Sequence, residues 1–255
     1  MANESVTKTF AVALTLCVVC AVVVSTAAVS LRPLQEANKL LDLKTNILAS
    51  AGLLEEGVDV ETQFDKISVK LVDLNTGRYS DALDVDNYDQ RKASSDPSLS
   101  VALSSSKDIA KIKRRANLAK VFVVESSKGL EKIILPIKGY GLWSTLYGFI
   151  ALESDLKTVA GIGFYEHTET PGLGGEVDNP KWKASWIGKT AYSNDRLSLE
   201  VIKGKVDTAR AGADSKIDGL AGATLTSKGV DNLIKYWLGE QGFKPFIDNL
   251  KSGEA

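Results

Sequence analysis

The sequence has very little of the chemistry that most catalytic sites use. His167 is the only histidine in 255 residues, so a multi-histidine metal centre is excluded. The two cysteines, Cys17 and Cys20, lie in an apolar N-terminal stretch, which leaves the rest of the chain without thiolate ligands or disulfides. A Ser-His-Asp or Cys-His set is equally hard to assemble. We therefore predict neither catalytic residues nor metal ligands.

The net charge is small, and one long segment has no charged residue. The formal net charge is −1, and without a basic excess the chain is not expected to bind nucleic acid. The segment from Thr9 to Leu31 has no charged residue at all, and Lys8 and Arg32 bracket it. Neither a G-x-G-x-x-G pattern nor a P-loop occurs, so the common nucleotide-binding motifs are absent.

The uncharged segment predicts one membrane-spanning helix within residues 1–32. A helix of this length, at about 1.5 Å per residue, crosses a bilayer core of about 30 Å. Because Ser25–Ala28 is a run of small residues, a cleaved signal peptide is the alternative. Basic residues follow the span more often than they precede it, but this rule is weak for large domains. The charge pattern therefore leaves the orientation open.

Residues 33–255 are expected to form one soluble domain. Helical spacing of apolar residues predicts that Pro33 ends the span and that a separate amphipathic helix then runs to Gly52. A polar insertion near residues 80–106, with weak patterning, is expected to be partly irregular. Strands and helices then alternate unevenly, which favours a mixed α+β fold. The expected elements are a helix at 58–66, strands at 67–74 and 197–202, hairpins at 121–137 and 146–167, and a helix at 227–239.

The sharpest local pattern is a loop of small residues, beginning at Asp218, that leads into the last of these helices. Main-chain N–H groups at a helix start lack internal partners and carry partial positive charge, which suits an anion such as a phosphate. A simple helix cap from Thr226 or Ser227, with no ligand, is the alternative. The loop offers an anion small residues, hydroxyls and a cation: Gly222, Ala223, Thr224, Thr226, Ser227 and Lys228.

A second glycine-rich loop spans residues 165–175 and follows a predicted strand. Its proline and three glycines would let the backbone pass close to a flat ring system. In that interpretation Leu173 forms a packing wall, Gly174 allows close approach, and Glu169 or Thr170 provides a polar contact. An ordinary tight connection is the alternative.

A third segment, Gly139–Ser144, joins two predicted strands. Trp143 could stack on an aromatic ligand, with Ser144 beside it, or it could be a core tryptophan. The sequence does not separate these two interpretations.

The string from Asp218 to Thr224 resembles the acceptor motif of flavin transferases. These enzymes join FMN through its phosphate to the hydroxyl of the motif's final threonine. The resemblance implies that Thr224 carries covalent FMN, with Thr226 as a nearby competitor. Ala221 stands where the motif commonly has Ser or Thr, which loses a hydroxyl but keeps the small volume. His167 would then be either a proton donor to reduced flavin or a packing or capping residue.

Together, the membrane span, the three segments and their order resemble the C subunits of the sodium-translocating NADH:quinone reductases over nearly the whole chain. The resemblance implies a single-pass protein of the bacterial inner membrane with its domain on the periplasmic side. It also implies a partnership with other subunits, maturation by a flavin transferase, and a role as an intermediate carrier of electrons from NADH, oxidised elsewhere in the complex, towards ubiquinone. Three alternatives remain: the G subunit of the related Rnf electron-transport complex, an anchored enzyme that binds free FMN reversibly, and an anchored binding module without a cofactor.

Overall fold

The computed structural model describes residues 5–127 and 129–255, so part of the predicted 1–32 segment and Lys128 of a predicted turn lie outside it. The chain divides into two units, after Leu43. The long helix α1 (Val6–Ser50) supplies the first unit, and its residues from Val6 to Asp42 are exposed. It is long and apolar enough to cross a membrane.

Helix α1 differs from the prediction at Pro33, which lies inside the helix instead of ending it. Proline removes one main-chain hydrogen bond, to the carbonyl four residues earlier, but its fixed φ is compatible with a helix. The intrahelical bonds on both sides hold the helix together across that gap. The predicted span and the predicted amphipathic helix are therefore parts of one element.

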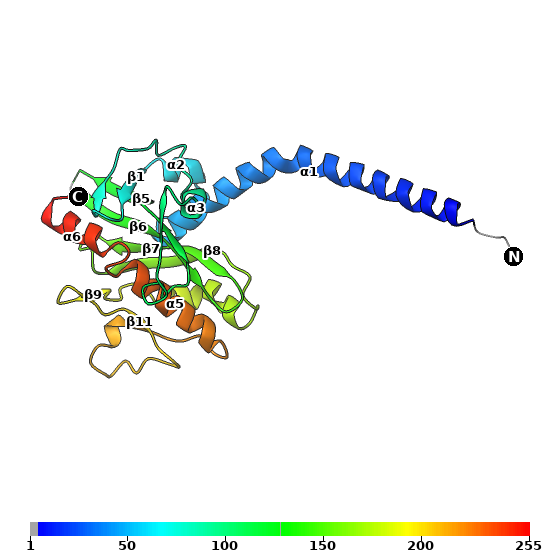
Figure 1. Cartoon of the computed structure of the whole chain (residues 1–255). Coiled ribbons are helices and arrows are strands. Elements are labelled where there is room, and N and C mark those ends of the chain that lie inside the picture. The colour runs from blue at the N-terminus through cyan, green and yellow to red at the C-terminus, as the bar shows by residue number, and fades with distance from the viewer. Residues whose placement is uncertain (1–4, 128) are drawn as a thin grey trace. The chain divides into compact units, whose positions relative to one another are not determined.

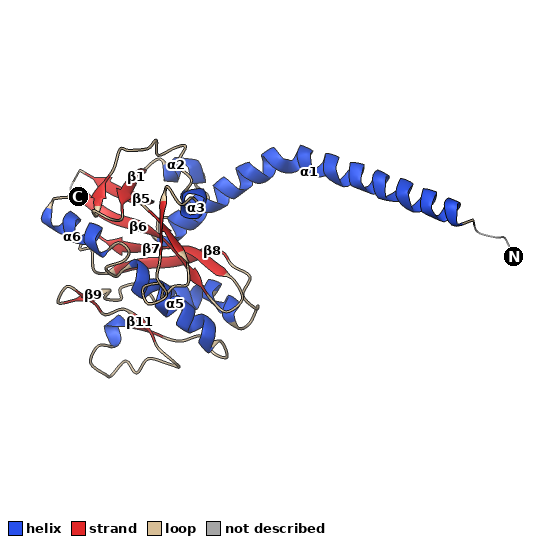
Figure 2. Ribbon diagram, in the orientation of Figure 1, coloured by secondary structure: helices blue, strands red, loops and turns tan. Residues whose placement is uncertain are grey.

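A six-stranded antiparallel sheet forms the centre of the second unit (Figures 1 and 2). Its order is β2-β1-β5-β6-β7-β8, and each neighbouring pair is antiparallel. The two predicted hairpins are confirmed, as β5–β6 and β7–β8. The strands are β1 (Ile67–Asp73), β2 (Arg78–Tyr79), β5 (Leu118–Ser126), β6 (Gly129–Tyr140), β7 (Thr145–Glu153) and β8 (Val159–Glu166).

Helix α5 (Thr224–Trp237) packs on one face of this sheet. The approach is close, because a Cβ on Gly139 of β6 would lie 2.5 Å from the Leu233 side chain. The other face receives the last residues of α1, where a Cβ on Gly161 would lie 2.5 Å from the Ser50 carbonyl oxygen. Glycines at these places therefore allow helices to lie directly on the strands.

The insertion at 80–106 is more ordered than predicted. Arg91 of α3 (Gln90–Ser95) forms an ion pair with Glu166 at 2.9 Å, and its guanidinium lies 3.7 Å from the Tyr147 ring centroid. The predicted strand at 197–202 is two short strands, β10 (Arg196–Leu197) and β11 (Glu200–Val201). The remaining elements are α2 (Val60–Phe64), which confirms the helix predicted at 58–66, β3 (Ser100–Ala102), β4 (Arg114–Ala116), η1 (Gly174–Asp178), α4 (Pro180–Ala184), β9 (Tyr192–Ser193), η2 (Ala213–Ser215), β12 (Lys216–Ile217) and α6 (Lys244–Ser252).

Candidate functional site

The start of α5 is a helix N-terminus without a side-chain cap. Helix α5 begins at Thr224, three residues before the predicted start, and its N-cap residue Ala223 has no capping side chain. Gly222 adopts φ +72°, a left-handed conformation that favours glycine. Within the described residues, the main-chain N–H groups of Thr224, Leu225 and Thr226 donate to no protein acceptor, and Ser227 is the first to bond back, to Ala223. Three free donors thus converge at the helix start.

The three hydroxyl groups of this turn differ in burial and in hydrogen bonding. Thr226 is fully buried, and its Oγ1 donates to Oε2 of Glu169 at 2.7 Å. Ser227 Oγ accepts the N–H of Leu220 at 2.8 Å and donates to the Ala223 carbonyl at 3.0 Å. Neither side chain caps the helix, so the simple-cap interpretation is wrong. The Thr224 side chain is exposed and, in the described part of the chain, its hydroxyl has no hydrogen-bond partner.

Glu169 joins the second and third segments to α5. Its side chain is buried, and Oε1 accepts the N–H groups of Leu142, Trp143 and Ser144 at 3.0, 2.9 and 3.2 Å. Burial by itself would raise the pKa of this carboxyl. The hydrogen bonds from Thr226 and from the three N–H groups outweigh burial and hold the pKa below its ordinary value. Glu169 is therefore an ionised, fully bonded carboxylate.

Two glycines leave room for this carboxylate. A Cβ on Gly141 would lie 2.6 Å from Glu169 Oε1, and a Cβ on Gly174 would lie 2.5 Å from Thr226 Oγ1 and 2.7 Å from Glu169 Oε2. Contacts this short do not occur at real Cβ atoms, so any side chain would displace the carboxylate. Both glycines are therefore required by the protein's own packing. For Gly174, this packing is a reason for glycine in addition to the predicted close approach of a ligand.

Large apolar side chains stand exposed around the start of α5. Trp143 is 65 % exposed, whereas Trp182, Trp186 and Trp237 are all below 10 %. The core interpretation of Trp143 is therefore wrong. Leu225, which follows Thr224, is 61 % exposed, and Leu173, 45 % exposed, reaches within 3.0 Å of the Cβ position of Gly222. Exposed apolar groups at one place favour the binding of a ligand or partner.

The other predicted side chains near this site take structural or solvent-facing positions. His167 accepts the N–H of Glu169 at Nδ1, as the capping interpretation predicts, and its Nε2 lies 2.7 Å from Asp178. Ser144 Oγ accepts the N–H of Thr168 at 2.8 Å. Thr170 is exposed, and its carbonyl accepts two N–H groups of the glycine loop.

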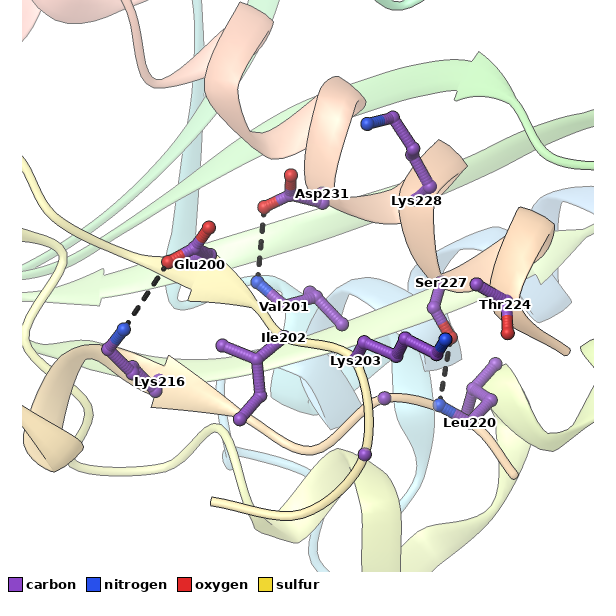
Figure 3. Close-up of a pocket in the computed structure, with 12 residues that line it drawn as sticks. Glu200, Val201, Ile202, Lys203, Lys216, Leu220, Thr224, Ser227, Lys228 and Asp231 are labelled. Atoms are coloured by element: carbon purple, nitrogen blue, oxygen red, sulfur yellow. Dashed lines mark hydrogen bonds and ion pairs between the residues drawn. The ribbon is translucent and has the colours of Figure 1, made fainter. Parts of the chain in front are cut away.

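A cavity of 520 Å³ opens beside Thr224 and was only partly foreseen from the sequence (Figure 3). Parallel pairing of β11 with β12 brings a second segment to the start of α5. The second segment adds Lys203 to the cavity lining, and Lys203 has no ion pair among the described residues. In Figure 3 the Lys228 side chain points away from Thr224. The lining residues are Glu200, Val201, Ile202, Lys203, Gly204, Lys216, Gly219, Leu220, Thr224, Ser227, Lys228 and Asp231.

Comparison with known proteins gives consistent matches. Residues 141–239 match the family model of the FMN-binding domain, a range that includes the first two segments and the third from Gly141 onward. The chain is 57 % identical to the C subunit of the Na⁺-translocating NADH-quinone reductase of Pseudomonas aeruginosa over the full length of both chains. It is 46 % identical to the corresponding protein of Vibrio anguillarum, covering 98 % of this chain and 97 % of that one.

Solved structures agree with the sequence matches. The crystal structure of the NqrC protein from Shewanella oneidensis superposes with a TM-score of 0.77 at 35 % identity, covering 85 % of this chain and 99 % of that one. The crystal structure of the corresponding reductase protein from Parabacteroides distasonis gives a TM-score of 0.65 at 28 % identity, covering 85 % and 96 %. The predicted α+β fold is therefore confirmed.

Proposed function

Because the chain belongs to the family of C subunits of the Na⁺-translocating NADH-quinone reductases, we propose that it is the component of such a complex that carries FMN bonded covalently to Thr224. The family match over the whole chain supports this assignment over the G subunit of the Rnf complex. The other subunits are its partners, and a flavin transferase attaches the cofactor during maturation.

The observation that carries the proposal is the state of the Thr224 hydroxyl. It is the one hydroxyl of the turn that is exposed and unbonded in the described structure, while the competitor Thr226 is buried against Glu169. Phosphate oxygens attached there would meet the free N–H groups of the first turn of α5. The site therefore offers a phosphate ester at Thr224 three unpaired main-chain donors.

The remaining residues have supporting roles in this proposal. Trp143 and Leu173 offer apolar surface for the isoalloxazine ring, and Lys203 adds positive charge to the cavity that Thr224 lines. The bound flavin would supply the electron-accepting and electron-donating chemistry. The chain itself tethers, orients and partly shields it. Electrons would arrive from NADH by way of another subunit and leave towards ubiquinone.

Denaturing gel electrophoresis under ultraviolet light tests the proposal. The full chain, co-expressed with a flavin transferase, should give a fluorescent band that survives denaturation. Thr224→Val should abolish the band, and Thr226→Val is the matched control that should keep it. Loss of fluorescence on denaturation of the wild type would indicate reversible FMN binding, and absence of flavin before denaturation would favour a cofactor-free module. Either result contradicts the proposal.

A further inference from the structure

The Glu169 carboxylate connects three segments that are far apart in the sequence. Its two oxygens accept hydrogen bonds from the main chain of residues 142–144 and from Thr226 of α5. Thr226 lies in the same helical turn as Thr224. The carboxylate is thus a short bridge between the loop that displays Trp143 and the turn that displays Thr224.

No cation neutralises this carboxylate within the described structure. Its partners are N–H groups and one hydroxyl, and no lysine or arginine forms an ion pair with it. A buried carboxylate with only dipolar partners keeps a full negative charge in a region of low dielectric constant. The charge is therefore a fixed electrostatic feature of the site.

The surrounding sequence accommodates the bridge at several points. Gly141 and Gly174 each lack the Cβ that would strike it, and the His167 ring accepts the N–H of Glu169 itself. Because the carboxylate is already bonded to four protein donors, it is not free to act as the polar contact to a flavin that the sequence suggested. Its influence on the cofactor is therefore exerted through the groups that it holds and through its charge.

We propose that Glu169 is a positioning residue, which fixes the Trp143 loop against the first turn of α5 and keeps a negative charge there that lowers the midpoint potential of the flavin. The electrostatic half of this proposal rests on the proposed function, whereas the geometric half concerns the protein alone. The sign follows from Coulomb's law, because a nearby negative charge disfavours the addition of an electron.

Hydrogen exchange tests the geometric half on the full chain in detergent, produced without a flavin transferase. In Glu169→Ala the amides of residues 142–144 should exchange at least about tenfold faster than in the wild type, because three hydrogen bonds to a charged acceptor are lost. Glu169→Gln keeps an acceptor oxygen and should stay near the wild-type rate. Glu169→Asp, which is one methylene shorter, should also exchange faster and serves if the alanine variant does not fold.

The midpoint potential tests the electrostatic half on flavin-bearing protein. Glu169→Gln should have a more positive potential than the wild type, and the matched control Glu166→Gln, which removes an exposed charge, should shift it less. A Glu169→Gln potential that is equal to or more negative than the wild-type value would overturn this half. Amide exchange at the wild-type rate in both Glu169→Ala and Glu169→Asp would overturn the geometric half. Failure of flavin attachment alone leaves the exchange result intact and counts against Thr224 instead.

Discussion

Substituting alanine for Gly174 should disrupt the site in a way that the structure specifies. The added Cβ would lie 2.5 Å from Thr226 Oγ1 and 2.7 Å from Glu169 Oε2, so both side chains would have to move. Overpacking of this kind costs about 1–3 kcal/mol. Breaking the hydrogen bond between Thr226 and the ionised carboxylate adds about 1.5–3 kcal/mol. We expect Gly174→Ala to lower the free energy of unfolding by about 2.5–6 kcal/mol.

Thermal unfolding of the full chain in detergent measures this effect, with Gly172→Ala as the matched control. Gly172 adopts φ +75° but has no atom within 4 Å of its Cβ position. The control should therefore lose only the cost of a left-handed backbone, about 1–2 kcal/mol. A domain of this size loses about 2–4 °C in Tm for each kcal/mol. Equal Tm values for the two variants, with flavin attachment unchanged in both, would refute the packing described here.

Three further predictions concern the same site, and a fourth concerns the side of the membrane on which the domain lies. Trp143→Ala should leave the Tm within about 2 °C of the wild type, because the ring is exposed, but should increase quenching of flavin fluorescence by iodide. Acid should destabilise the wild type: the pKa of Glu169 is lowered on folding, so its contribution is present above the ordinary value of 4.5 and is lost as pH falls through the folded pKa. Glu169→Gln should flatten that dependence, as measured by urea unfolding. Lys203→Ala should slow flavin attachment in a time course, whereas Lys205→Ala should not. Protease added to sealed spheroplasts should cut the large domain, and full protection would place it in the cytoplasm.

The sequence predicted those parts of the fold that depend on local patterns. Apolar runs joined by short turn sequences located both hairpins, and the apolar stripe that follows Lys228 located α5. The flavin acceptor string singled out Thr224 before any geometry was known. One local prediction was wrong, because Pro33 was expected to end a helix. The helix continues through Pro33, since its remaining main-chain hydrogen bonds hold it together.

The features that escaped prediction depend on contacts between distant segments. Nothing in the sequence pairs Glu169 with Thr226, which lie 57 positions apart. Their buried hydrogen bond was therefore not predicted, and the sequence suggested Glu169 as a ligand contact and Thr226 as a competing attachment residue. Lys203 reaches the cavity only because β11 pairs with β12, and two-residue strands leave no readable periodicity. Exposure of Trp143 is likewise a tertiary property, since stacking and core tryptophans look alike in sequence.

Mass spectrometry of one tryptic peptide tests the central claim most directly. Cleavage after Lys216 and Lys228 releases residues 217–228, which contain Thr224 together with Thr226 and Ser227. From flavin-bearing protein, the peptide should be heavier by the mass of FMN less one water, and fragmentation should place that mass on Thr224. An unmodified peptide, or an adduct on Thr226, would contradict the account.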